Sequence, residues 1–257
     1  MGGGVLVERT GDVVWCTLDR PPLNLLDPEL IDALRTTFTG LAADPSVRVA
    51  VLTGRGRAFT AGMDVHVLHD LDVPRAKTLI TALHAAIESV HHAPFPVLAG
   101  VNGHCLGAGF ELALACDLRI AASGATFGLP EVRVGVPSVI EAALLPGLVG
   151  PGRAAELLLT GEAIDAAQAE AWGLVNRVVP AEGLRGALDE LIARILACGP
   201  AAIRLQKELM VGWRYTDLAA AITSGINAFA TAYATDEPRE GARAFLGKRA
   251  PRFGGRS

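Results

Sequence analysis

The chain has 257 residues, of which 51% are hydrophobic and 19% are charged, and its formal net charge is −4. No run rich in Lys and Arg occurs before the C-terminal end, so nucleic acid is not an expected partner. The N-terminal residues lack a basic segment followed by an apolar core, and no uninterrupted apolar stretch reaches about 18 residues, so neither a secretory signal nor a membrane span is expected.

The four cysteines favour a reducing compartment. Cys16, Cys105, Cys116 and Cys198 form no C-x-x-C pair, and none lies near a histidine pair with zinc spacing. His104 is next to Cys105, but two side chains do not complete a metal shell. We therefore expect a cytoplasmic protein with free thiols and no metal site, in which Cys105 is a small core residue rather than a nucleophile.

The first predicted elements are a β-hairpin and a helix. Two β-rich runs flank a turn at Thr10–Asp12 within residues 5–19, which is typical of a hairpin. The segment LDPELIDALRTTFTGLAAD predicts a helix with Asp27 as its N-cap and Pro28 in its first position. Apolar residues then recur at helical spacing: Leu30, Leu34, Phe38 and Leu41.

Further along the chain, strands and helices alternate. Nearly continuous apolar runs predict buried strands at 47–54 and 95–103. Further strands are expected at 118–122 and 125–132, a loop at 54–64 and a helix at 73–91. From residue 138 the chain is mostly helical, with one β-like run, GLVNRVV. This order predicts an α/β fold with a core over residues 1–190 and a C-terminal helical region over 191–257.

Two glycine-containing turns follow the first two buried strands. They are FTAGMD (59–64) and LGAGFE (106–111), and neither matches a dinucleotide or P-loop motif. One interpretation is two tight strand-to-helix turns, with Asp64 as a helix N-cap or loop brace. The other is a pair of backbone amide donors, because small residues at a helix start let a ligand carbonyl approach unpaired N–H groups. Such donors stabilise an oxyanion by roughly 3–4 kcal/mol each.

Two glutamates strengthen the second interpretation. Glu111 lies in an apolar helix start, and Glu131 follows Pro130 after a predicted strand. Individually, each has an ordinary explanation: an acid favoured by the helix dipole, and a solvent-facing strand end. A buried carboxylate is costly, however, and two acids in different environments can divide acid and base roles. Together they indicate an active site.

Five segments in order resemble the crotonase superfamily, whose founding members are enoyl-CoA hydratases. The segments are GRGRAFTAGMDV, GVNGHCLGAGFELALACDLRIAA, ATFGLPEVRVGVP, LLLTGEAIDAAQAEAWGLVNRVVP and FLGKRAPRF. The resemblance covers about residues 4 to 253. It implies a spiral of ββα units with a C-terminal helical trimerisation region, and assembly as a homo-oligomer, either a trimer or a dimer of trimers.

The resemblance also implies roles for individual residues. Met63 and Ala108 would supply the two oxyanion amides, Glu111 would hold and activate water, and Glu131 would exchange the proton at the α-carbon of an acyl-CoA thioester. No separate cofactor is implied, because coenzyme A is part of the substrate. The residues expected along the coenzyme A channel are Leu23, Leu25, Ala61, Asp64, Val65 and Lys248, the last often reaching across from another subunit.

One segment departs from the family pattern. Many hydratases have a glycine-rich P-G-A-G-G turn after the second glutamate, whereas this chain has GVPSVIEAALLPGLVG, with the bulkier Val139 and Ile140 and a third acid, Glu141. We expect Ser138 and Glu141 to form a capping box that opens a helix. The alternative is that Glu141 joins catalysis or alters specificity. His66 could approach the ligand or be an exposed helix-start residue.

The expected activity is hydration of a 2-enoyl-CoA, in fatty acid metabolism, through an oxyanion-stabilised thioester enolate. An enoyl-CoA isomerase using the same enolate is the first alternative, and thioester hydrolysis is another. A non-catalytic acyl-CoA-binding protein would not need both Glu111 and Glu131.

Overall fold

The computed structural model describes residues 4–253, and its strands form two sheets. The larger sheet has the order β1, β2, β3, β5, β7, β10, with bounds Val5–Thr10, Val13–Leu18, Val49–Gly54, Val97–Val101, Leu118–Ala122 and Arg177–Val179. The smaller has the order β4, β6, β8, β9, with bounds Ala58–Thr60, His104–Leu106, Thr126–Gly128 and Ile164–Asp165. The pairs β1–β2 and β8–β9 are antiparallel; all other pairs are parallel.

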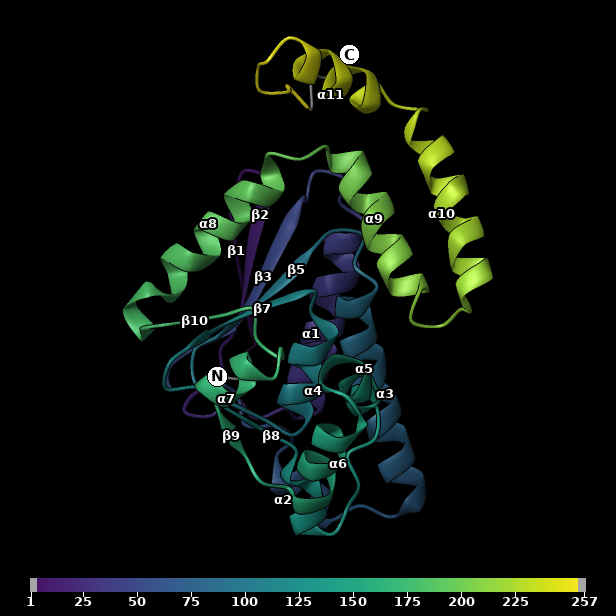
Figure 1. Cartoon of the computed structure of the whole chain (residues 1–257). Helices are drawn as coiled ribbons and strands as arrows, with labels where there is room; N and C mark the ends of the chain where they lie inside the picture. Colours follow the sequence, from purple (N-terminus) through teal and green to yellow (C-terminus); the bar gives the residue numbers. More distant parts are fainter. Residues whose placement is uncertain (1–3, 254–257) are drawn as a thin grey trace.

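From β3 to β8, successive strands alternate between the two sheets, as a ββα spiral requires. Strands β3, β5 and β7 each pair in the larger sheet, and the strands that follow them, β4, β6 and β8, pair in the smaller. Helix α3 leads from β4 back to β5 and α4 from β6 back to β7, whereas after β8 the chain adds β9 to the smaller sheet before α7 leads to β10. The fold class expected from the resemblance is therefore confirmed (Figure 1).

The helices begin and end as follows: α1 Pro28–Ala42, α2 Val65–His69, α3 Val73–His91, α4 Ala108–Ala115, α5 Leu145–Val149, α6 Pro151–Thr160, α7 Ala166–Ala171, α8 Leu184–Leu196, α9 Pro200–Gly212, α10 Leu218–Ala232 and α11 Glu237–Leu246. Three short 3₁₀ helices are η1 Pro130–Val134, η2 Glu141–Leu144 and η3 Ala181–Gly183. Asp27 caps α1 as expected, since its side chain accepts a hydrogen bond from the backbone N–H of Leu30 at 2.9 Å.

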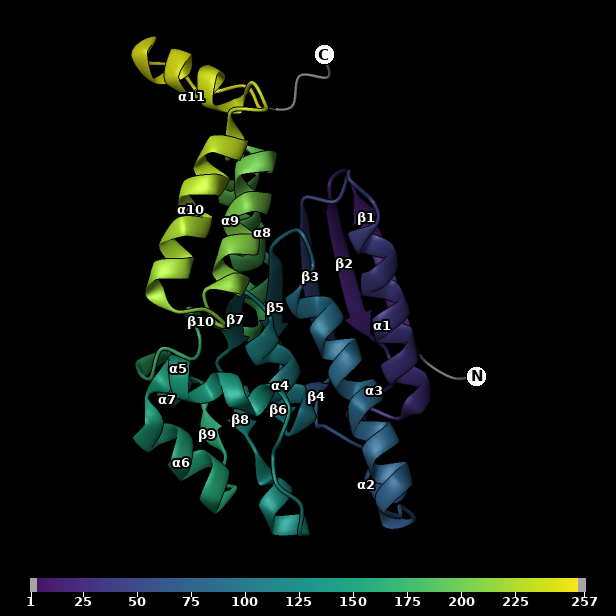
Figure 2. The same ribbon diagram turned by 90° about the vertical axis from the view of Figure 1, so that its right-hand side faces the viewer.

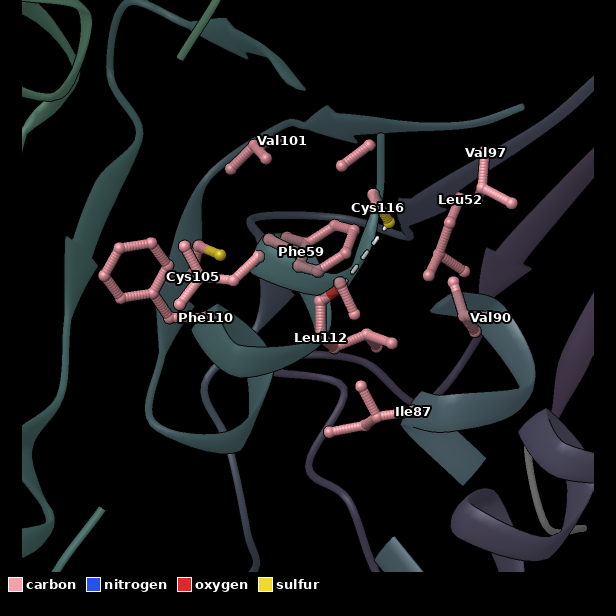
Figure 3. Packing of buried hydrophobic residues seen from close by; sticks show 14 of the residues in the cluster. Leu52, Phe59, Ile87, Val90, Val97, Val101, Cys105, Phe110, Leu112 and Cys116 are labelled. Carbon is pink, nitrogen blue, oxygen red and sulfur yellow. Dashed lines mark hydrogen bonds between the residues drawn. The ribbon is translucent and has the colours of Figure 1, made fainter. Parts of the chain in front are cut away.

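Both faces of the larger sheet are covered. Helices α1, α3 and α4 enclose the main apolar core on one face, and α8 packs on the other, against Trp15, Val49 and Val51 among others. Figure 3 shows part of the main core, where side chains from both sheets meet α3 and α4; those labelled are Leu52, Phe59, Ile87, Val90, Val97, Val101, Cys105, Phe110, Leu112 and Cys116. Burial of each large apolar side chain contributes about 1.5–3 kcal/mol. Cys105 is fully buried among them, as expected of a core residue.

The helix α4 lies at the centre of this arrangement. Every one of its eight residues is buried, and its sequence is apolar on all sides except for Glu111. A helix of this kind is stable only inside a core. The fold therefore fixes Glu111 firmly and keeps its carboxyl group out of bulk water.

The last three helices extend away from the core (Figures 1 and 2). Helix α9 is anchored by a buried ion pair, in which Lys207 Nζ lies 2.6 and 2.7 Å from the two carboxylate oxygens of Asp117. Helix α10 lies against α9 and buries no residue fully. The expected boundary at residue 190 falls inside α8, which packs on the sheet, so the projecting part starts with α9.

Short strands account for most differences from the expected elements. The segment expected as a loop at 54–64 contains β4, and only 126–128 of the expected strand 125–132 is extended; Glu131 lies in η1 instead. The hairpin, α1, α3 and the buried strands β3, β5 and β7 agree with expectation. Within residues 4–253 no helix is long and apolar enough to cross a membrane.

Candidate active site

An apolar cavity of about 520 Å³ lies where α2, α3, the start of α4 and the η1 segment meet. Both glycine turns and both predicted catalytic glutamates line it. The apolar residues around them come mainly from α2, α3 and the segment after η1: Val65, Leu68, Leu71, Leu79, Ile80, Leu83, Val134, Val136 and Val139. A mostly apolar pocket with a few convergent polar groups is the usual form of a small-molecule site.

The two glycine turns touch one another at this cavity. Gly62 has φ +88°, and a Cβ there would lie 2.8 Å from the carbonyl oxygen of Leu106 and 3.5 Å from the backbone nitrogen of Ala108. Gly107 has φ +55°, and a Cβ there would lie 3.9 Å from Gly62 Cα. Both positions thus combine a left-handed backbone with a contact that leaves no room for a side chain. The turns bring the peptides of Met63 and Ala108 to the same corner.

The N–H groups of these two peptides are not engaged elsewhere. The Leu26 N–H donates to the Gly62 carbonyl at 2.9 Å, and the Leu26 carbonyl accepts from the Asp64 N–H at 3.1 Å. The Met63 N–H, between these two residues, takes no part in this pairing. Ala108 is the first residue of α4, where N–H groups have no partner in the helix. Neither the Met63 nor the Ala108 N–H donates a hydrogen bond within residues 4–253.

Glu111 is buried beside these amides, one turn into α4. Its residue is only 3% exposed, and one carboxylate oxygen, Oε2, has no hydrogen-bond partner in the described part of the chain. Burial, and then the charge of Glu131, raise the pKa of Glu111 from its ordinary value of 4.5 to about 7. The backbone N–H groups of Ala142 and Glu141 act in the opposite direction by favouring the carboxylate. Glu111 can therefore both accept and release a proton near neutral pH.

Glu131 approaches the cavity from η1 on the other side. Its Oε2 accepts a hydrogen bond of 2.7 Å from the hydroxyl of Ser138, and its Oε1 faces Gly107, whose added Cβ would lie only 2.6 Å away. The side chain is half-buried. Met63, Ala108, Glu111 and Glu131 thus all line one cavity, and their catalytic roles stay predictions from the sequence.

The capping box expected from Ser138 and Glu141 is wrong. The turn η2 begins only at Glu141, and Ile140 stands at its N-cap with no side-chain hydrogen bond to the turn. Ser138 binds Glu131 instead. Glu141 is buried, and its Oε1 lies 2.7 Å from Nδ1 of His84 in α3. Both side chains find partners outside the segment, and these partners outweigh a local cap.

Only some of the residues expected along the coenzyme A channel line the cavity. Ala61 and Val65 line the cavity, and the Ala61 N–H donates to the carbonyl of Leu23 at 3.0 Å. Asp64 caps α2 by accepting from the His66 N–H, and His66 is exposed at the helix start. Leu25 precedes the Leu26–Met63 bridge.

Lys248 lies in the turn after α11, at the opposite end of the chain from α2 (Figure 1). It is exposed and is not among the residues that line the cavity.

The sequence alone gave no sign of two residues that hold the acids. The spacing of Ser138 predicts a cap, and His84 lies in α3, 57 positions before Glu141. No motif connects residues so far apart. Within the described residues, no group of three or more His, Cys, Asp or Glu side chains has the geometry of a metal site.

Comparison with known proteins agrees with the fold. The enoyl-CoA hydratase/isomerase family model matches residues 8–256. A crotonyl-CoA hydratase of Syntrophomonas wolfei is 36% identical over 252 residues, covering 97% of each chain. A mevalonyl-coenzyme A hydratase of Aspergillus fumigatus is also 36% identical, over 97% of this chain and 94% of its own.

A solved enoyl-CoA hydratase from Bacillus anthracis superimposes with a TM-score of 0.93 at 35% identity, covering 98% of this chain and 99% of its own. The fold and these relatives define an enzyme of the hydratase type. The chain belongs to the enoyl-CoA hydratase/isomerase family, that is, to the crotonase superfamily.

Proposed function

We propose that this protein is an enoyl-CoA hydratase, which adds water across the double bond of a 2-enoyl-CoA thioester. One observation carries the proposal. The backbone N–H groups of Met63 and Ala108, which donate no hydrogen bond within the described residues, lie at the same apolar cavity as Glu111 and Glu131. The names of similar hydratases over nearly the whole chain support it.

In the proposed reaction, the thioester carbonyl oxygen accepts hydrogen bonds from the Met63 and Ala108 amides. These donors, aided by the positive end of the α4 dipole, draw electron density from the C=C bond onto that oxygen. The β-carbon becomes electrophilic. A water molecule held by Glu111 attacks it, and Glu111 takes the proton that the water loses.

Glu131 completes the addition. It delivers a proton to the α-carbon as the enolate collapses, so that one hydroxyl and one hydrogen have been added across the double bond. The Ser138 hydroxyl holds the other oxygen of its carboxyl group. A proton then returns from Glu111 to Glu131, directly or through solvent, and restores both acids for the next turnover.

The proposal is tested with crotonyl-CoA as substrate. Hydration removes the ultraviolet absorbance of the conjugated thioester without releasing free thiol, whereas hydrolysis releases thiol. Glu131→Gln is expected to lower kcat roughly 10²–10⁴-fold, the usual contribution of a general acid or base. Undiminished turnover in that variant would remove Glu131 as the proton donor. An inert crotonyl-CoA, together with conversion of a 3-enoyl-CoA, would favour the isomerase instead.

We also propose that the chain forms a homo-oligomer, a trimer or a dimer of trimers, through α10. That helix carries an exposed apolar stripe, formed by Leu218, Ile222, Ile226, Phe229 and Tyr233. Contiguous exposed apolar surfaces are typical of protein interfaces. In such an assembly Lys248 would reach the coenzyme A of a neighbouring subunit. The cytoplasmic location, the absence of a separate cofactor and the absence of a nucleic-acid partner stay predictions from the sequence.

Which acyl group is processed is a separate question. Two relatives of equal identity carry the names of different acyl groups, crotonyl and mevalonyl. Overall similarity therefore does not select the acyl chain. Turnover of a panel of 2-enoyl-CoA thioesters of increasing length and branching would identify it, because the side chains that line the cavity, Val139 among them, limit the group that fits.

A further inference from the structure

A third glutamate is buried behind the proposed catalytic pair. Glu141 is 7% exposed; its Oε1 lies 2.7 Å from His84 Nδ1, and its Oε2 has no hydrogen-bond partner within the described residues. A buried carboxyl group with one unpaired oxygen costs stability, since an apolar side chain of similar volume would pack there without that cost. Its presence at this position therefore suggests a role other than stabilising the fold.

The position of Glu141 couples it to Glu111. It is the first residue of η2, which packs directly on α4. The backbone N–H groups of Glu141 and Ala142 face the Glu111 carboxyl group and favour its ionised form, while the Glu141 side-chain charge disfavours it. One short turn therefore acts on Glu111 both through amides and through a charge.

The other charged groups near this pair come from α3 and η1. On α3, Oε2 of Glu88 lies 3.9 Å from Nε2 of His84, and both side chains are half-exposed. Glu131 faces Glu111 from η1. The imidazole of His84 is itself half-exposed, so it joins the buried Glu141 to solvent. The pKa of Glu141 is raised overall, because the effect of burial exceeds the opposite effect of the hydrogen bond and charge of His84.

We propose that Glu141, braced by His84, is a positioning residue for Glu111: it fixes the η2 amides on the Glu111 carboxyl group and sets the pH at which that group ionises. This inference rests on the proposed hydratase function for its catalytic consequence, but not for its effect on Glu111 itself. Glu141 touches neither substrate nor reacting atoms in this scheme; it acts through the geometry and charge around Glu111.

Two substitutions separate geometry from charge. Glu141→Gln keeps the size of the side chain and an oxygen for His84 but removes the charge. Its Glu111 should ionise at a pH lower by up to about one unit, because a like charge has gone, and the acid limb of the kcat profile should move by the same amount. Glu141→Ala removes the brace and should lower kcat about tenfold with KM changed less than about twofold, as expected when only transition-state positioning is lost.

The direct measurement is a carbon-13 NMR titration of the glutamate carboxyl groups, with the Glu111 signal assigned by its loss in Glu111→Gln. Glu88→Gln is the matched control, because it removes the other carboxylate beside His84 without touching η2; it should leave the Glu111 titration in place. An unchanged Glu111 titration in Glu141→Gln would overturn the inference, even if Glu141→Ala fails to fold. This titration needs no turnover, so it decides the inference even if the wild-type protein hydrates no enoyl-CoA and the proposed function fails.

Discussion

The hydroxyl of Ser138 donates a 2.7 Å hydrogen bond to Oε2 of Glu131, seven residues before it in the chain. This bond orients a carboxyl group that is otherwise half-exposed on the short 3₁₀ helix η1. Ser138→Ala should therefore lower kcat about 5–10-fold, which corresponds to the roughly 1–1.5 kcal/mol of one hydrogen bond. Ser138→Thr keeps the hydroxyl and should retain most of the activity. Steady-state kinetics on crotonyl-CoA compares them; equal loss in both variants would point to packing and not to the hydrogen bond.

Glu111 makes stability depend on pH in a defined direction. Its pKa is about 7 in the folded chain against an ordinary 4.5, so between these values the folded state binds more protons than the unfolded state. The stability that this group contributes is complete below about pH 4.5 and is lost as the pH rises through 7. Relative to Glu111→Gln, the wild type should lose on the order of 3 kcal/mol between pH 4.5 and pH 8.

Urea unfolding of both proteins across that pH range measures this difference. The glutamine variant has no group to ionise at this position, so it serves as the reference for all other titrating groups. Parallel stability curves for the two proteins would mean that Glu111 is not held in its protonated form by the fold.

Gly107 combines two constraints that a single substitution can separate. An alanine Cβ there would lie 2.6 Å from Glu131 Oε1, and its backbone has φ +55°. Gly11, in the β1–β2 hairpin, has nearly the same φ of +60° but nothing within 4 Å of an added Cβ. Gly11→Ala should lose about 1–2 kcal/mol from its positive φ, and Gly107→Ala, with φ +55° and ψ −131°, should lose at least as much.

Only Gly107→Ala should also displace the Glu131 carboxyl group, and we expect its kcat to fall about 100-fold while Gly11→Ala keeps wild-type activity. Thermal unfolding and kinetics on the two variants check both parts. A Gly107→Ala enzyme with normal kcat would show that Glu131 need not lie against this turn.

Local sequence rules predicted the elements whose patterns are long, and missed those fixed by tertiary contacts. Helix α1 followed from Asp27, Pro28 and its apolar spacing. Strand β4 is only three residues long and exists because it pairs with β6, which no local pattern reveals. Within the site, the two turns and two acids were found because each follows a buried strand and because five segments in order resemble one family.

The surroundings of the acids could not be found in the same way. Ser138 and Glu141 have the spacing of a capping box, and the sequence offers a complete local explanation for them. In the structure Ser138 binds Glu131 and Glu141 binds His84. These side chains lie close enough to replace the backbone N–H groups of a cap as partners of the same hydroxyl and carboxyl groups. His84 reaches Glu141 only after α3 has packed on α4, so the pairing is a consequence of the fold.

The exposed stripe on α10 is the surface through which we propose that copies of the chain assemble. Phe229 is 70% exposed and Leu218 is 77% exposed on a helix that lies at the edge of the chain (Figure 2). A charge placed in the middle of that stripe would remain solvated in a free chain but would be buried in an oligomer, at a cost of several kcal/mol. Ile226→Lys should therefore dissociate the oligomer while leaving the chain folded. Leu159, 78% exposed on α6 and outside the stripe, offers the matched control Leu159→Lys.

Analytical ultracentrifugation, with circular dichroism to monitor folding, tests the pair. The control should sediment as the wild type does, and the Ile226 variant as a smaller species. If Lys248 reaches a neighbouring subunit, dissociation should also raise KM for the acyl-CoA, and Lys248→Ala should raise KM in the intact oligomer. An Ile226→Lys protein that stays assembled would show that copies of this chain do not meet through α10, and Lys248 would then have no route to a neighbouring cavity by this face.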